Sequence, residues 1–338
     1  MKLNILSDAE HLVSFFIRFE SWHGDCLLKS VKLLFFYFLH FYLKGKIMRK
    51  SLLLVAVLGT FATSQAVMAE EATSPAAAPT PTWTFPSSVS LVSDYIWRGQ
   101  SQTWGNPAVQ AGIEADHVSG AYVGFWGSNV SSNWLPNANV EMDFSAGFRN
   151  TLATDFKYDV GGVYIYYPDG DFAKSAYAAD LGYTKSKLNS LELYGSLGWK
   201  WFTVKAGYMP TKFYGWNTNN SSPNTNPASF NGDTHAGVTG NTNGSYYYMA
   251  SASYDVPAVA GLNVSGEVGR QTIAESTGLD WTWYKVGVTK TFADTWAVNA
   301  FYTATTGSNA YQGFSSFANA TTSNVDTSKV VVGITKSF

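Results

Sequence analysis

The stretch Val140-Glu141-Met142-Asp143-Phe144-Ser145-Ala146-Gly147-Phe148-Arg149 alternates apolar and polar residues without a break. In an extended strand, successive side chains point to opposite faces of the sheet. All the apolar residues of this stretch therefore share one face, and the charged residues share the other. A strand with one apolar and one charged face is typical of a barrel whose outer surface contacts lipid and whose inner surface contacts water.

The same period of two recurs along the chain after residue 87. Strand lengths match the roughly 9 to 11 residues that a tilted strand needs to cross a bilayer. We predict twelve strands, over residues 88–99, 108–117, 121–129, 139–150, 155–166, 189–199, 201–212, 245–254, 261–272, 281–292, 295–305 and 328–338. The predicted fold class is all-β, a transmembrane antiparallel up-and-down β-barrel of about 12 strands.

The connections between these strands alternate in length. Every second link is short, as for residues 118–120 and 293–294, whereas the links over 167–188, 213–244 and 306–327 are long. Outer-membrane barrels have short periplasmic turns and longer outer loops, so both termini are expected on the periplasmic side. Pairing Ala115 with Val123 and Ile113 with Phe125 requires a three-residue turn, in which Gly120 takes the left-handed position.

Composition excludes other classes of protein. Charged residues make up 14% of the chain and aromatic residues 16%, whereas soluble domains use about a quarter of their residues for charge. A mean hydropathy of -0.07 excludes a polytopic helical membrane protein. A soluble β-sandwich is the alternative, although its connections need not alternate in length.

The N-terminal region divides into three parts. Met48-Arg49-Lys50 followed by the apolar run 51–59, with Val67-Met68-Ala69 as a cleavage site, is typical of a secretory signal peptide over 48–69. Residues 1–47 are then interpreted as a mis-annotated upstream extension, with a genuine extended leader as the alternative. Residues 70–86, rich in Ala, Pro and Thr, are predicted to be a flexible periplasmic tail, and residues 87–338 the outer-membrane barrel.

Cleavage after Ala69 removes Cys26, the one cysteine, so no disulfide is expected. The mature chain keeps 14 Lys and Arg against 20 Asp and Glu. A nucleic-acid partner is therefore not expected, because such binding needs clustered basic residues.

Two stretches carry a resemblance to a known family. The first is Val92-Ser93-Asp94-Tyr95-Ile96-Trp97-Arg98-Gly99-Gln100-Ser101-Gln102-Thr103, and the second is Gly124-Phe125-Trp126-Gly127-Ser128-Asn129. They resemble the V-S-x-Y-x-x-R-G-x-S-Q-T and Gly-x-W-x-S-N runs of the TorF family of proteobacterial porins. The resemblance extends more weakly over 87–338, and it implies an outer-membrane location and diffusion of small solutes.

The C-terminus resembles the terminal strand signal that the barrel assembly machinery reads. Gly333 and the final Phe338 fit that signal, while Lys336 departs from it because an aromatic or apolar residue is usual there.

The sequence favours no enzymatic chemistry. The mature chain has two histidines, His117 beside a short turn and His235 in a long loop, and a hydrolase would need a histidine next to a nucleophile. The run Asp169-Gly170-Asp171 could hold calcium, but these are also ordinary turn residues. No catalytic, cofactor-binding or metal residue is predicted.

The inward faces of the strands supply the candidate functional residues. By parity, the following side chains are predicted to line the pore: the acids Asp94, Glu114, Asp116, Glu141, Asp143, Asp159, Glu192 and Glu267, and the bases Arg98, Arg149, Lys157 and Lys205. Their acidic excess predicts a mild preference for cations. In the alternative, these charges pair across strands and fill a narrow lumen. Arg98 either lines the constriction or pairs with Asp94, Glu114 or Asp116.

The prediction from sequence is a monomeric porin-like channel for passive diffusion of small hydrophilic solutes. Its expected partners are the lipid bilayer, lipopolysaccharide, the barrel assembly machinery and the solutes themselves. The alternative is a non-conducting surface barrel that acts as an adhesin or scaffold through its long loops.

Overall fold

The computed structural model describes residues 81–223, 235–326 and 328–338. The predicted upstream extension, the predicted signal peptide and most of the predicted tail lie outside these residues. None of the helices in the described ranges is long and apolar enough to cross a membrane.

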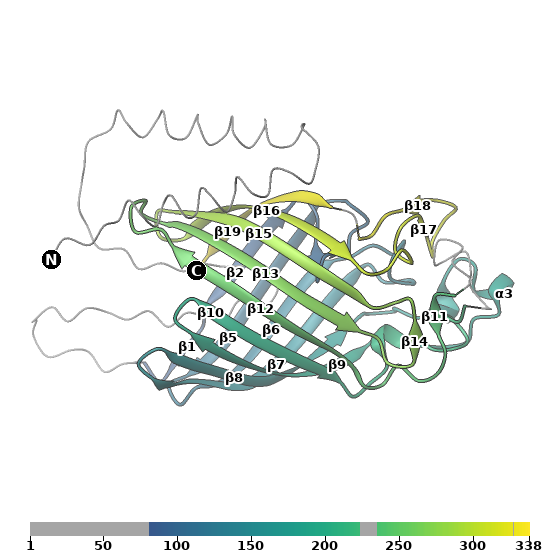
Figure 1. Cartoon of the computed structure of the whole chain (residues 1–338), viewed down its shortest axis with the longest axis horizontal. Coiled ribbons are helices and arrows are strands. Elements are labelled where there is room, and N and C mark those ends of the chain that lie inside the picture. Colours follow the sequence, from purple (N-terminus) through teal and green to yellow (C-terminus); the bar gives the residue numbers. More distant parts are fainter. Residues whose placement is uncertain (1–80, 224–234, 327) are drawn as a thin grey trace, which may run out of the picture. The chain divides into compact units, whose positions relative to one another are not determined.

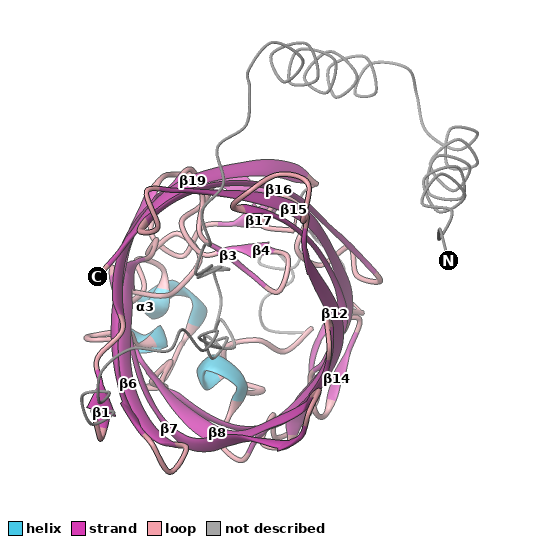
Figure 2. Cartoon of the chain, turned by 90° about the vertical axis from the view of Figure 1, so that its left-hand side faces the viewer, coloured by secondary structure: helices cyan, strands magenta, loops and turns pink. Residues whose placement is uncertain are grey.

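Twelve antiparallel strands close into a ring, which Figure 1 shows from the side and Figure 2 along its axis. The ring closes where the last strand pairs with the first, through Gly333 opposite Val92. Its strands, in chain order, are β2 (Ser87–Val92), β5 (Ala108–His117), β6 (Ala121–Asn129), β7 (Val140–Ala153), β8 (Phe156–Tyr166), β9 (Ser190–Trp199), β10 (Phe202–Met209), β12 (Ser245–Asp255), β13 (Leu262–Thr272), β15 (Trp281–Phe292), β16 (Trp296–Thr306) and β19 (Lys329–Ser337). The predicted fold class is confirmed.

Short and long connections lie at opposite ends of this barrel. The end with the short links, such as 118–120 and 293–295, is called the turn end, and the other is called the loop end. The loop-end connections carry short elements: β3 (Ile96–Trp97), β4 (Gln100–Ser101), η2 (Phe172–Lys174), α3 (Ala178–Leu181), η3 (Phe213–Gly215), β11 (Gly237–Val238), β14 (Ser276–Thr277), β17 (Phe314–Ser315) and β18 (Thr322–Ser323). Figure 1 shows five of these elements, α3, β11, β14, β17 and β18, at its right-hand end.

The first predicted strand, 88–99, is wrong in its second half. β2 ends at Val92, and the chain then forms a small hairpin of β3 and β4. Arg98 and Gly99 at its tip have φ of +47° and +82°. Two consecutive positive φ angles make a tight reversal, so the strand cannot continue along the wall.

The predicted tail is also wrong at its end. β1 (Trp83–Thr84) pairs with β5, Trp83 opposite His117 and Thr84 opposite Asp116. The amide of Glu114 donates to the carbonyl of Pro86 over 3.0 Å. This segment extends the sheet at the turn end.

Alternation places the two faces of the strands as predicted. On β7, Glu141 and Asp143 are buried at 3% and 2% exposure, whereas Val140, Phe144 and Phe148 on the other face are exposed. The outward face of the ring carries a wall of exposed apolar side chains, among them Leu91, Val109, Val123, Val160, Leu197, Val204, Val268, Val286, Val298 and Val332.

The turn at 118–120 confirms the predicted register, since Ala115 pairs with Val123 and Ile113 with Phe125. Gly120 has a φ of +98°. A Cβ added there would overlap the carbonyl oxygen of Arg149 on the neighbouring strand. The position therefore needs glycine both for its backbone conformation and for space.

We expect Gly120→Ala to lower the free energy of unfolding by more than about 2 kcal/mol, because the left-handed strain of about 1–2 kcal/mol adds to the overlap with Arg149. Gly182→Ala is the matched control, since Gly182 also has positive φ, at +66°, and open space around its Cβ position. Urea unfolding followed by tryptophan fluorescence measures both. Equal losses in the two variants would contradict the assigned turn geometry.

Candidate functional site: the barrel interior

Aromatic side chains from the loop-end connections, together with Tyr247 of β12 and Trp281 and Trp283 of β15, gather in the interior at that end. They are almost completely buried and form one cluster with apolar neighbours. The aromatic members are Tyr95, Trp97, Trp134, Tyr167, Phe172, Tyr183, Phe213, Tyr214, Trp216, Tyr247, Trp281, Trp283, Tyr311, Phe314 and Phe317. We call this set the aromatic plug.

The rings of the aromatic plug pack edge to face. Trp134 lies with its centroid 4.7 Å from that of Phe314 and 6.1 Å from that of Tyr311. Trp97, from the small hairpin, lies 5.3 Å from Tyr214 in a T-shaped pair. Aromatic pairs in this geometry stabilise a core beyond the area that they bury. The loops thus form a core of their own across the barrel.

The hairpin of β3 and β4 is tied at its base by Asp94. One carboxylate oxygen of Asp94 accepts hydrogen bonds from the hydroxyls of Ser101, at 2.6 Å, and Thr103, at 2.8 Å. The other oxygen pairs with the Lys329 ammonium on β19 at 2.7 Å. Figure 2 shows β3 and β4 within the outline of the ring.

At the hairpin tip, Arg98 spans to other strands of the wall. Its guanidinium pairs with Glu192 on β9 at 2.7 Å and donates to the Gln271 side chain on β13 at 2.6 Å. The same group lies 3.4 Å from the ring centroid of Tyr247 on β12 and 4.2 Å from that of Trp97. Of the two predicted alternatives, pairing with an acid is observed, but its partner is Glu192 instead of Asp94, Glu114 or Asp116.

Two further acids of β7 are buried beside the aromatic plug. Glu141 accepts hydrogen bonds from the hydroxyls of Tyr95, at 2.9 Å, and Tyr167, at 2.7 Å. Asp143 has one carboxylate oxygen without a hydrogen-bond partner among the described residues. Burial of carboxylates this close together has a high cost unless protons or hydrogen bonds compensate it.

Nearer the turn end, one side of the wall carries a charged layer. Arg149 pairs with Glu114 at 2.7 Å, and its guanidinium lies 3.9 Å from a carboxylate oxygen of Asp116. The Tyr122 hydroxyl donates to Asp159 over 2.7 Å.

The layer ends with Lys205 and Lys157. The Lys205 ammonium lies 3.7 Å from the ring centroid of Tyr194, whose hydroxyl is 2.5 Å from that of Tyr122. Lys157 is exposed at the rim.

The opposite side of the wall holds an ion pair of which the sequence predicted the acid but not the base. Glu267 pairs with Lys285 at 3.1 Å and accepts from the indole nitrogen of Trp283 at 2.6 Å. Lys285 and Lys329 were not among the predicted pore-lining residues. Parity would have found Lys285, because it lies two residues after Trp283 on the inward face of β15.

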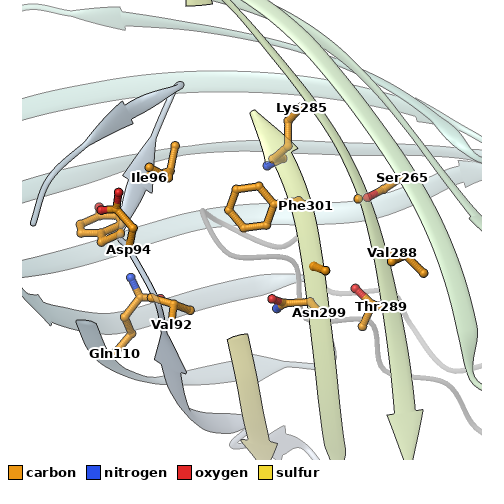
Figure 3. A pocket seen from close by; sticks show the side chains of 13 residues that line it. Val92, Asp94, Ile96, Gln110, Ser265, Lys285, Val288, Thr289, Asn299 and Phe301 are labelled. Atoms are coloured by element: carbon orange, nitrogen blue, oxygen red, sulfur yellow. The ribbon is translucent and has the colours of Figure 1, made fainter. Parts of the chain in front are cut away.

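A small cavity lies between the hairpin and this side of the wall. Its volume is about 40 Å³, enough for water molecules. Figure 3 shows Asp94 and Ile96 of the hairpin region on one side, and Lys285, Asn299 and Phe301 of β15 and β16 on the other.

The residues considered for calcium binding, Asp169 and Asp171, and one of the histidines considered for hydrolysis, His117, make other contacts in the structure. Asp169 pairs with Lys174 at 2.8 Å, which lowers the pKa of the Asp169 carboxyl. Asp171 caps η2 through the amide of Ala173, and no cluster of three acids, histidines or cysteines that could hold a metal exists within the described ranges. His117 is hydrogen-bonded to Ser119 and packs against Trp83.

The residues of the predicted assembly signal lie on the last strand. The amide of Phe338 donates to the carbonyl of Ser87 over 2.9 Å, and its ring is exposed. Gly333 faces inward, where a Cβ would press on Asn299 and Val92. The Lys336 ammonium donates to the Thr295 hydroxyl over 2.6 Å.

Comparison with protein families gives a match over residues 76–338 to Gcw_chp, described as bacterial proteins of unknown function. The chain belongs to the Gcw_chp family. A search of curated proteins finds no match. The Gcw_chp description does not carry the TorF name that the sequence motifs suggested.

Solved structures similar to this Gcw_chp chain include two porins and an outer-membrane protein. The KdgM porin and the NanC porin each share 8% identity, cover 75% of this chain and 99% of theirs, and have a TM-score of 0.41. OpdK from Pseudomonas aeruginosa shares 13% identity and covers 69% of this chain and 58% of its own, with a TM-score of 0.33. Since these scores are low, the fold is assigned from the strand register alone.

We expect Trp134→Ala to lower the free energy of unfolding by about 3–5 kcal/mol, the usual loss for truncating a buried tryptophan. Limited proteolysis should also cut the loop-end connections faster, because Trp134 joins three of them. Leu181→Ala is the control, since Leu181 is an exposed residue of α3. An unchanged cleavage rate in Trp134→Ala would show that the aromatic plug does not hold the loops.

Proposed function

We propose that this protein is an outer-membrane channel for the passive diffusion of small hydrophilic solutes. The observation that carries the proposal is the division of the barrel into an apolar outer wall and an inner face of paired charges. A hydrophilic interior and a lipid-facing exterior both follow from that division. The resemblance of the 92–103 and 124–129 runs to the TorF family of porins agrees with it.

The positions of aromatic side chains support placement in a bilayer. Exposed rings lie near the turn end, at Trp199, Trp201 and Trp296, and near the loop end, at Tyr164 and Tyr246. Tryptophan and tyrosine favour the level of the lipid headgroups. Lipid and lipopolysaccharide are accordingly the proposed surroundings of the wall, with the turn end toward the periplasm.

The proposed selectivity is a mild preference for cations. Lys285 and Lys329 reduce the acidic excess that parity predicted, and most inner charges are paired. Asp116 and Asp159 lie toward the turn end and are partly exposed, and we propose that they are the acids that entering ions meet first there. Rings of charge at the mouth of a pore set its ion preference.

The aromatic plug favours a second candidate, the non-conducting barrel that acts through its outer loops. A core of buried rings across the loop end leaves little free space for a solute. In that case the connections 167–188, 213–244 and 306–327 would carry the function as an adhesive or scaffolding surface.

Single-channel recording in planar bilayers separates the two candidates. The channel predicts discrete current steps and a reversal potential of cationic sign in a KCl gradient. The preference should weaken in about 1 M salt, where the Debye length falls to about 3 Å. A shift in electrophoretic mobility on heating would show that the protein is folded. If such folded protein gives no current at any voltage, the channel is rejected and the loop-based function is favoured.

We expect Asp116→Asn combined with Asp159→Asn to shift the reversal potential toward zero, because both carboxylates lie toward the turn end. Asp169→Asn is the control, since Asp169 lies in a loop-end connection and is exposed. If the control shifts the reversal potential by the same amount, the carboxylates at the turn end do not set the ion preference.

We also propose export through the segment 48–69 with cleavage after Ala69. N-terminal sequencing of the protein from the outer-membrane fraction should start at Glu70. A start upstream of Met48 would favour an extended leader instead.

A further inference from the structure

We propose that the hairpin of β3 and β4 is the gate of this channel and that Arg98 is its latch. The proposal rests on the proposed channel function. It assigns to one short segment the transition between the arrangement seen here, with the hairpin inside the ring, and a more open one.

The turn chemistry of the hairpin indicates a role for Arg98 beyond local structure. A two-residue turn with positive φ at both positions prefers Asn-Gly or Asp-Gly, since these residues tolerate the left-handed conformation. Here the pair is Arg98-Gly99, with Arg98 at a φ of +47°. A long side chain in this conformation is strained by local sterics, so contacts elsewhere must hold it.

Those contacts join the hairpin tip to the wall. The guanidinium of Arg98 reaches Glu192 on β9 and Gln271 on β13, and it lies over the Tyr247 ring on β12. Its carbonyl accepts from the indole nitrogen of Trp281 at 2.8 Å. Arg98 thus contacts four strands of the wall: β9, β12, β13 and β15.

The base of the hairpin is held differently. The amide of Ser93 donates to the carbonyl of Val332 on β19 over 2.8 Å, and Asp94 pairs with Lys329 on the same strand. The base is therefore fixed to β19, and the middle of the hairpin is fixed to the connection before β19, since the amide of Ser101 donates to the carbonyl of Val325 over 2.7 Å. The tip reaches the wall across the interior mainly through side-chain contacts. A segment anchored at one end and latched at the other can turn about its base once the latch opens.

The cavity of Figure 3 lies at the foot of the hairpin. Tyr95 and Ile96 line one side of it, and Asn299 and Phe301 of the wall line the other. Ile96, the first residue of β3, would leave this lining if the hairpin turned about its base, at the expense of the hairpin's contacts with the aromatic plug.

The first test is the double variant Arg98→Asn with Glu192→Gln in planar bilayers. Asn suits the turn, and the paired change leaves no unmatched charge in the interior. Openings should become at least about tenfold more frequent, since a buried charge-assisted hydrogen bond is worth at least one tenfold step in an equilibrium. Asp169→Asn with Lys174→Met removes an exposed ion pair of a loop as the matched control.

The second test replaces the latch with a reversible covalent staple. Arg98→Cys with Glu192→Cys puts a thiol at each end of the ion pair between the hairpin tip and β9, and a bifunctional methanethiosulfonate spans the length of the two lost side chains. Cys26, the one native cysteine, is replaced by serine. The bridged protein should lose its openings, and a reductant should restore them in the same molecules.

The outcomes separate the gate from the channel. A conducting protein whose openings are unaffected by both the latch variant and the staple overturns the gate and leaves the channel intact. Folded protein that is silent in all forms, the latch variant and the reduced staple included, overturns the proposed function together with the gate.

Discussion

The constraint on which the structure depends is that every strand must find a backbone partner on both sides. An open sheet leaves a row of unpaired amides and carbonyls at each edge, and lipid offers no hydrogen bonds to satisfy them. Pairing of β19 with β2 removes both edges. Closure in turn sorts every residue of a strand to the inside or the outside, so the chemistry of the two surfaces follows from the parity of the sequence.

Closure creates a second requirement, because it brings charged side chains together inside a narrow ring. Buried charges are costly unless they are paired or hydrogen-bonded. Glu192, Glu267 and Asp94 each meet a cation, while Glu141 receives two tyrosine hydroxyls. Most charges of the interior are thus paired or hydrogen-bonded from the turn end to the aromatic plug, whereas one carboxylate oxygen of Asp143 has no hydrogen-bond partner among the described residues.

The motif shared with the TorF family gains a physical explanation from this arrangement. Its serine and threonine, here Ser101 and Thr103, hold Asp94 at the base of the hairpin. Its Arg-Gly pair forms the tip, where Gly99 fits against Trp283 and Thr305 with no room for a side chain. The motif therefore builds an element inside the barrel, whereas its position after β2 had suggested a continuing strand.

The sequence by itself determined the twelve strands, the alternation of short and long connections, and the Gly120 turn. These features depend on local period and turn chemistry, which neighbouring residues in the chain carry. The same parity predicts a set of inward charges, from which Lys285 and Lys329, the partners of Glu267 and Asp94, were left out. Only the tertiary structure decided that residues 93–103 turn into the lumen, that Arg98 pairs with Glu192, and that the loop aromatics form one core. Those contacts join residues far apart in the chain, such as Trp281 and Arg98 at 183 positions and Lys329 and Asp94 at 235 positions. They exist only because ring closure brings opposite walls within reach of each other, and no local pattern records that distance.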